Sequence, residues 1–219
     1  RNPELSKMGT TLVCLAMLDE RLYIGNVGDS RAYIIRDGKI SVLTIDHTVV
    51  ADLVRAGALS PEQAKSTPIS HMLTQSLGAD EKVDVDTWIA EAGPARGDKF
   101  LLCSDGLYAQ LSEDEIQSIC ASYPTAEALQ RLVRRANELG GFDNVSVILV
   151  DILQGYPREK AADETLLPRR KIEALQDSVE KVPAPSDIEQ ASPLPLPGAA
   201  TLPPSRISVG PIQGVVFVC

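Results

Sequence analysis

Aspartates in three short turns are the residues of this sequence that could perform chemistry together. They lie in Gly28-Asp29-Ser30, Ser104-Asp105-Gly106 and Phe142-Asp143-Asn144, each at one end of an apolar run. Strand ends can bring distant carboxylates to one rim of a fold, and carboxylate oxygens are preferred ligands of magnesium and manganese. A water on such a cation becomes a nucleophile near neutral pH. Asp29, Asp105 and Asp143 are therefore candidate metal ligands.

An ordinary turn is the alternative for each of these segments. Aspartate beside glycine is common in turns, where its side chain often accepts hydrogen bonds from nearby backbone. Asp37-Gly38 has the same composition and is typical of a tight hairpin. Spacing and composition alone leave both possibilities open.

Four apolar runs near the start of the chain would position the first turn. They cover Leu12–Leu18, Leu22–Val27, Arg31–Arg36 and Lys39–Thr44. The first run is apolar throughout, which is typical of a strand buried on both faces. Because only short polar turns separate the runs, we predict a four-stranded antiparallel meander with Asp29 between its second and third strands.

Helices and further strands follow this meander. Apolar spacing predicts a helix after residue 48, Ser60-Pro61-Glu62-Gln63 is a typical helix start, and Ser112 with Glu115 forms a capping box. Thr125 is expected to cap a longer helix that ends at Gly140. Strands are predicted over Met72–Leu77, Val83–Ile89, Phe100–Cys103 and Val145–Ile152. Together these elements predict an α+β fold built on antiparallel sheets.

Charge and proline content divide the chain in two. Residues 1–154 hold 22 acidic and 14 basic residues, whereas residues 155–219 are nearly neutral and hold ten of the 15 prolines. We therefore predict a folded domain over 1–154 and a proline-rich, disordered tail over 155–219. The acidic domain argues against nucleic acid as a partner. No run is long enough for a membrane span, and four cysteines without ligand spacing suggest a reducing, cytoplasmic setting.

Four ordered motifs give a more specific indication. Over residues 8–152 the chain resembles the metal-dependent protein phosphatases of type 2C, the PPM family, in its compact bacterial branch. The motifs are Met8-Gly9-Thr10-Thr11, Gly25-Asn26-Val27-Gly28-Asp29-Ser30-Arg31-Ala32-Tyr33, Leu101-Leu102-Cys103-Ser104-Asp105-Gly106-Leu107 and Gly140-Gly141-Phe142-Asp143-Asn144-Val145-Ser146-Val147.

The resemblance implies a fold, a metal centre and a reaction. The family fold is a sandwich of two antiparallel sheets flanked by helices, with two manganese or magnesium ions at one end. Asp105 and Asp143 match metal-ligand aspartates at the catalytic centre, and Asp29 matches one that helps to hold a weaker third ion. Water activated by the metals attacks phosphorus directly, so that phosphoserine or phosphothreonine in a protein substrate is hydrolysed. Residues 46–72 correspond to a flap beside the site.

Departures from the family pattern qualify this expectation. The N-terminal Asp-Gly-x-Gly-Gly motif and an upstream phosphate-binding arginine are absent, which we interpret as truncation of the first strands. We therefore expect little turnover from this fragment alone. His71 and Gln75 stand where relatives often carry asparagine and arginine, and for both histidines, His47 and His71, we expect hydrogen bonding rather than metal binding. The alternative to an enzyme is a non-catalytic, phosphatase-like binding or regulatory domain.

Overall fold

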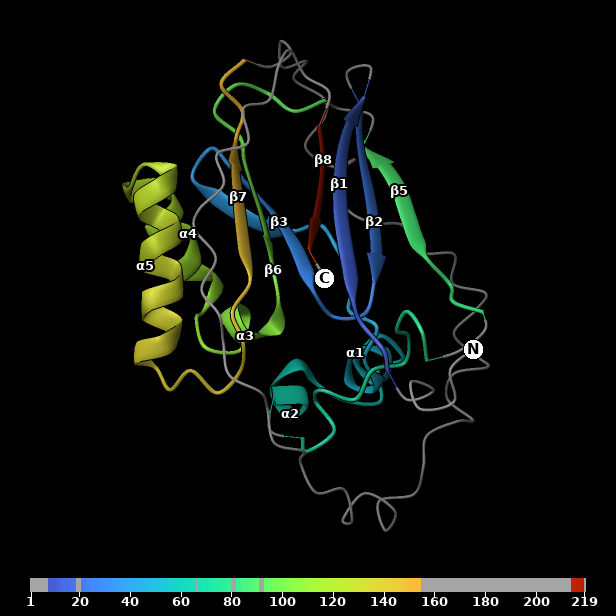
Figure 1. Ribbon diagram of the computed structural model, residues 1–219. Coiled ribbons are helices and arrows are strands. Elements are labelled where there is room, and N and C mark those ends of the chain that lie inside the picture. Colours follow the sequence, from blue (N-terminus) through green and yellow to red (C-terminus); the bar gives the residue numbers. More distant parts are fainter. Residues whose placement is uncertain are drawn as a thin grey trace.

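The computed structural model describes residues 8–18, 21–65, 67–79, 82–90, 93–154 and 214–218. Eight strands in these segments form two antiparallel sheets of four strands that face each other (Figure 1). The first sheet has the order β5-β2-β1-β8 and contains β1 (Leu12–Leu18), β2 (Arg21–Val27), β5 (Asp86–Ala90) and β8 (Gly214–Val218). The second has the order β4-β3-β6-β7 and contains β3 (Arg31–Arg36), β4 (Lys39–Val42), β6 (Lys99–Cys103) and β7 (Val147–Asp151). The predicted α+β fold with two antiparallel sheets is confirmed.

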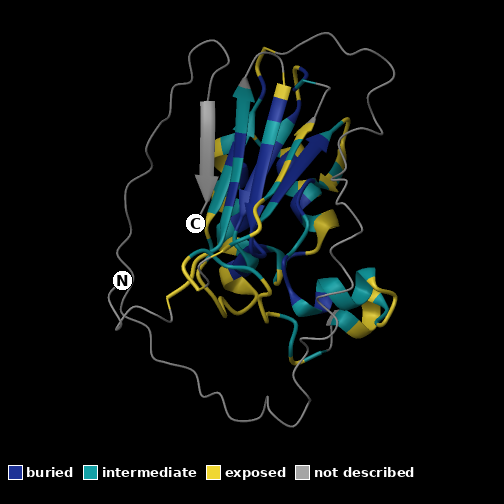
Figure 2. Ribbon diagram, turned by 90° about the vertical axis from the view of Figure 1, so that its right-hand side faces the viewer, coloured by how far each residue is buried: buried dark blue, intermediate teal, exposed yellow. Residues whose placement is uncertain are grey.

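The second sheet is covered on both faces, and its sequence shows why. Along β6, Phe100 and Leu102 pack into the core between the two sheets, whereas Leu101 and Cys103 pack beneath the helices on the other face. β3 alternates in the same way between these two cores. Successive strand residues point to opposite faces, so a strand with a core on each side must be apolar throughout. Figure 2 shows this burial as dark blue along the central strands.

The four opening strands do not form one meander, and this prediction is wrong. β1 pairs with β2, and β3 pairs with β4, but the two pairs belong to different sheets. The chain crosses between the sheets at Gly28–Ser30, where Gly28 has φ 99°. A side chain there would meet Thr11, because an added Cβ would lie 2.4 Å from its Cγ2 atom. The left-handed backbone and the close approach both require glycine.

Helices cover the outer face of the second sheet and the end of the sandwich. α4 (Glu113–Ser122) and α5 (Thr125–Glu138) lie beside β6 and β7, while α1 (Val49–Arg55), α2 (Pro61–Lys65) and α3 (Asp105–Tyr108) lie near one end (Figure 1). The predicted capping box of Ser112 and Glu115 is confirmed at α4, and Ser60 exchanges hydrogen bonds with Gln63 at α2.

Three local predictions are corrected by the structure. Thr125 is the first residue of α5 and not its cap, because Pro124 takes the N-cap position and the Thr125 hydroxyl donates to Asp151. Residues 72–77 form no strand and contribute only isolated bridges at Leu73 and Leu77. β5 begins at Asp86, three residues later than the predicted start at Val83.

The C-terminal apolar run belongs to the first sheet. β8 pairs antiparallel with β1, with Val218 opposite Val13 and Gly214 opposite Met17. The assignment of residues 155–219 to a separate tail did not anticipate this strand, although a β-branched run suits an open sheet edge. Residues 155–213 and Cys219 lie outside the described part of the chain. Within the described part, no helix is both long and apolar enough to cross a membrane.

Candidate metal centre

Strand register brings the three predicted aspartates to one end of the second sheet. Arg31 at the start of β3 pairs with Cys103 at the end of β6, and Cys103 pairs with Val147 at the start of β7. Asp29 precedes β3 by two residues, Asp105 follows β6 by two, and Asp143 precedes β7 by four. Because neighbouring strands are antiparallel, all three loops must emerge at the same end, close to α3 in Figure 1.

Hydrogen bonds fix the turn that carries Asp29. The Tyr108 hydroxyl of α3 donates to the Asp29 carbonyl oxygen at 2.8 Å, and the Ser30 and Thr11 hydroxyls lie 2.8 Å apart. Asp29 itself is only 8% exposed. A carboxylate so little hydrated is costly unless a cation or hydrogen-bond donors compensate it.

The loops of Asp105 and Asp143 are joined to each other. The Ser104 hydroxyl donates to the Asn144 carbonyl oxygen at 3.1 Å and accepts from the Ser146 backbone N–H at 3.0 Å. A Cβ added at Gly106 would lie 2.4 Å from the Asn144 carbonyl oxygen, so only glycine allows this approach. Asp105 directly follows Ser104 and is the first residue of α3. The sequence pattern did not predict this short helix.

Asp143 is the most exposed of the three aspartates. It follows Gly140 and Gly141, both with positive φ, at the end of α5. Its Oδ1 atom accepts a hydrogen bond of 2.6 Å from the Asn144 backbone N–H. This local contact with the next residue's backbone leaves the second carboxylate oxygen available for a ligand.

The three carboxylates act on one another electrostatically. Burial, and then the negative charges of Asp105 and Asp46, raise the pKa of Asp29 to about 6. Burial and the negative charge of Asp143 raise the pKa of Asp105 above its ordinary value. Like charges held near each other disfavour ionisation, so a divalent cation would relieve the repulsion that raises both values.

The donor type fits a hard divalent cation, since every candidate ligand is a carboxylate oxygen. Among the described residues, however, no group of three or more histidine, cysteine, aspartate or glutamate side chains is gathered closely enough to hold a metal ion. The residues thus lie at one end and interact in pairs, and they do not form a closed coordination shell.

Arg31, Asp46 and Tyr108 form a cluster beside the candidate site, and none of the three was predicted as a site residue. Arg31 donates to both carboxylate oxygens of Asp46, at 2.6 Å from its Nη2 atom, and its guanidinium lies over the Tyr108 ring at 3.8 Å. This ion pair ties the start of β3 to the segment before α1. Arg31 directly follows the Gly28-Asp29-Ser30 turn, and this adjacency in the sequence could have indicated that it lies near the site.

The two histidines contact different parts of the site. His71 is exposed, and its Nδ1 atom lies 3.9 Å from Asp105 Oδ2. His47 is fully buried and contacts Gly28 and Asp86. The prediction that both serve in hydrogen bonding holds for His47, whose contact with Asp86 spans 39 residues of sequence.

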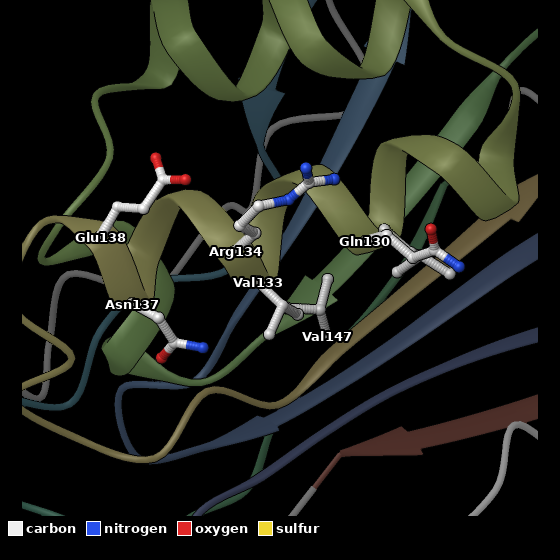
Figure 3. Close-up of a pocket in the computed structure, with 7 residues that line it drawn as sticks. Gln130, Val133, Arg134, Asn137, Glu138 and Val147 are labelled. Atoms are coloured by element: carbon white, nitrogen blue, oxygen red, sulfur yellow. The ribbon is translucent and has the colours of Figure 1, made fainter.

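A groove elsewhere on the surface is separate from these carboxylates. Its volume is about 770 Å³, and Val133 of α5 and Val147 at the start of β7 face it (Figure 3). Its other lining residues are Leu129, Gln130, Arg134, Asn137 and Glu138. It contains none of the three aspartates, so it does not serve the candidate metal centre.

Comparison with known sequences agrees with the order of these motifs. The sequence model described as Protein phosphatase 2C matches residues 1–53. The serine/threonine phosphatase Stp of Listeria monocytogenes is 40% identical over 149 residues, which is 68% of this chain and 58% of that protein. The protein phosphatase PhpP of Streptococcus pneumoniae is 42% identical over 148 residues, 66% of this chain and 58% of that protein. The chain thus spans less than two thirds of these curated relatives.

Solved structures show the same arrangement of sheets. The serine/threonine phosphatase PstP/Ppp of Mycobacterium tuberculosis superimposes with a TM-score of 0.65 at 36% identity, covering 71% of this chain and 64% of that one. A second structure, the PstP catalytic domain in complex with two manganese ions, has a TM-score of 0.61 at 36% identity, with coverage of 68% and 61%. Fold, motif order and sequence identity therefore agree, and this chain belongs to the bacterial branch of the metal-dependent type 2C protein phosphatase (PPM) family.

Proposed function

We propose that this chain forms part of a phosphatase that hydrolyses phosphoserine and phosphothreonine in proteins. Asp105 and Asp143 are the proposed catalytic metal ligands, and Asp29 is a proposed ligand of a further, weaker ion. The observation that carries the proposal is the placement of three aspartates, electrostatically coupled in pairs, at one end of the second sheet. The names of the phosphatases to which the chain is similar support the reaction.

Manganese or magnesium is the proposed cofactor, as two ions with a weaker third. A bound ion of this kind makes a coordinated water more acidic and stabilises negative charge on a phosphoryl group. The protein's own part is to hold the ligands in place. Ser104 and Gly106 lock the Asp105 loop against the Asp143 loop, and Tyr108 holds the Asp29 turn.

Metal-dependent stabilisation tests the proposed ligands directly. Manganese at a hundredfold excess over its Kd should stabilise the chain by about 2.7 kcal/mol, measured as a rise in Tm. Asp143→Asn should remove most of this shift. Asp37→Asn is the matched control, since Asp37 is also a turn aspartate but lies in the β3–β4 hairpin with φ 50°, and it should leave the shift unchanged. An equal response of the Asp143→Asn variant and the parent would refute the ligand assignment.

A non-catalytic domain that binds a phosphoprotein is the second candidate. The presence of Asp29, Asp105 and Asp143 counts against it, since a domain without catalysis need not keep three candidate ligand carboxylates. Phosphate release from a phosphothreonine peptide separates the two candidates when it is measured, with manganese, on the protein encoded by the whole gene. Metal-dependent release supports the enzyme, whereas peptide binding without release supports the binding domain.

The proposed partner is a phosphorylated protein rather than a nucleic acid, because the chain carries a net charge of −9. A reducing, cytoplasmic setting is also proposed. Cys14, Cys103 and Cys120 are free thiols, and Cys103 is fully buried. Imaging the tagged protein in cells tests this setting, and an extracellular signal would contradict it.

A further inference from the structure

His47 lies at the centre of the contacts that hold the Asp29 turn. Its imidazole is fully buried, and neither ring nitrogen is spare. The Gly28 backbone N–H donates to Nδ1 at 3.2 Å, and Nε2 lies 2.9 Å from Asp86 Oδ2 in β5. The ring therefore connects the turn directly before Asp29 with the edge strand of the first sheet.

These hydrogen bonds determine the tautomer of the ring. A backbone N–H can donate to Nδ1 only if that nitrogen carries a lone pair, so the ring proton is on Nε2. Nε2 then donates to the Asp86 carboxylate. Asp86 thus selects the tautomer that lets Nδ1 accept from Gly28, in the way that a carboxylate orients a histidine elsewhere.

The backbone of His47 holds the same turn from its other side. The His47 N–H donates to the Gly28 carbonyl oxygen at 3.0 Å, and Asn26 Nδ2 donates to that oxygen at 3.3 Å. Both polar groups of the Gly28 backbone are therefore bound by His47. Because Gly28 has φ 99°, its orientation sets the direction in which the chain enters Asp29.

His47 also joins this turn to the segment beside Asp105. Its carbonyl oxygen accepts from the Thr74 N–H at 2.8 Å, and Val49 N–H donates to the Met72 carbonyl oxygen at 2.9 Å. His71, which precedes Met72, is the residue that approaches Asp105. His47 thus connects the Asp29 turn and β5 through its side chain, and the loop that approaches Asp105 through its backbone.

We propose that His47 is a positioning residue for the metal centre, which acts by fixing the two peptide groups on either side of Gly28 so that the Asp29 carboxylate faces the site. The proposal rests on the proposed function, in which Asp29 is a metal ligand. His47 contacts no cation itself. Its predicted effect is therefore on the affinity of the ion that Asp29 binds.

Two variants of His47 separate positioning from general stability. Asparagine places a carbonyl oxygen near the position of Nδ1, whereas glutamine places its amide near Nε2. His47→Asn therefore keeps an acceptor for the Gly28 N–H, and His47→Gln keeps only the contact with Asp86. Both leave part of the imidazole volume empty, so similar decreases in Tm are expected from the two variants.

Manganese affinity, measured by isothermal titration calorimetry, is the readout. His47→Gln should weaken binding roughly tenfold, the usual scale for partners that orient a ligand, and His47→Asn should weaken it clearly less. Equal weakening by the two variants, or none by His47→Gln, would overturn the positioning role. If His47→Gln does not fold, Asp86→Leu tests the same link, because without Asp86 the tautomer is no longer fixed and affinity should fall.

A double-mutant cycle with Asp29→Asn distinguishes the failure of this inference from the failure of the proposed function. If His47 acts through Asp29, then His47→Gln should change affinity no further in the Asp29→Asn background. Additive losses would show that His47 acts independently of Asp29. If Asp29→Asn leaves manganese affinity unchanged, Asp29 is no ligand, so its assignment and the positioning role both fall, whereas the assignments of Asp105 and Asp143 are decided separately by the Asp143→Asn test. If Asp29→Asn weakens binding and His47→Gln does not, only the positioning role is refuted.

Discussion

Two buried aspartates lie near opposite ends of β3, and their negative charges are compensated to very different degrees. At one end Asp98 is completely buried, but Arg36 donates to both of its oxygens at 2.9 and 2.6 Å, and the Ala95 N–H donates at 2.7 Å. At the other end Asp29 is nearly as buried, and its neighbours include the carboxylates of Asp105 and Asp46. No ion pair among the described residues supplies Asp29 with a lysine or arginine.

This difference shows which carboxylate has its charge neutralised by the protein itself. The charge of Asp98 is neutralised inside the chain, so it serves the structure. The charge of Asp29 has no lysine or arginine partner among the described residues, so its ionised form opposes folding, and a cation at the proposed site would compensate it. Burial alone does not distinguish a candidate functional carboxylate, whereas burial together with a raised pKa and like-charged neighbours does.

The largest expected effect comes from removing the compensated carboxylate. Asp98→Ala should destabilise the protein by about 3–5 kcal/mol, because Arg36, with 12% of its side chain exposed, would lose its partner. Urea unfolding measures the loss. The double variant Arg36→Met with Asp98→Leu is the control, and it should be less destabilised than Asp98→Ala alone. A larger loss of stability in the double variant would show that the ion pair stabilises the protein by more than the desolvation of its two charges destabilises it.

A change of opposite sign is expected at the other end. Asp29→Asn should stabilise the metal-free chain at pH 7 by about 2 kcal/mol, less than the full shift implies because the carboxyl keeps some solvent contact. The pKa of Asp29 is about 6 when folded and 3.8 in its ordinary state, so the folded chain binds the proton more tightly. The ionised carboxylate thus destabilises the fold above pH 6, and this penalty is relieved as pH falls from 6 to 3.8.

Unfolding experiments at several pH values check this sign. The gain from Asp29→Asn should disappear below pH 3.8, where the carboxyl is protonated in both states. Asp37→Asn, at the hairpin end of β3, should show no comparable gain. If Asp29→Asn destabilises the metal-free chain at pH 7, the comparison between the two ends is wrong.

Salt should have the smallest effect on stability, and it tests how much of the Asp29 penalty comes from neighbouring charges. Raising sodium chloride from about 0.05 M to about 0.5 M screens repulsion between partly exposed charges. The parent should therefore gain stability relative to Asp29→Asn, by less than about 1 kcal/mol. Unfolding of both proteins at each salt concentration measures this difference. A constant difference would mean that Asp29 is destabilised by burial and not by its neighbours.

Local signals in the sequence predicted most of the elements. The apolar runs of β1 and β6, the capping box at Ser112 and the hairpin at Asp37-Gly38 each depend on a few adjacent residues. The motifs also indicated the three aspartates, because turn residues directly follow or precede those runs. What these signals share is that the physical cause lies within a few positions along the chain.

Pairings between distant residues could not be predicted in the same way. The crossing between sheets at Gly28 depends on Thr11 from β1, and the Arg36–Asp98 ion pair spans 62 residues. α3 is only four residues long and contains Gly106, so its local helix signal is weak, and contacts with the Asn144 loop hold it in place. The contact of His47 with Asp86 likewise depends on how the two sheets stack.

The central position of β6 in the second sheet should make its amide hydrogens exchange only when the protein unfolds. β6 is bonded to β3 on one side and to β7 on the other, and its side chains enter both cores. Its amide protons can meet solvent deuterium only when both cores come apart at once. The amides of Leu101 and Leu102 should accordingly be among the slowest to exchange and should report the global unfolding free energy. Amides at Phe142 and Asp143, in an exposed loop, should exchange orders of magnitude faster.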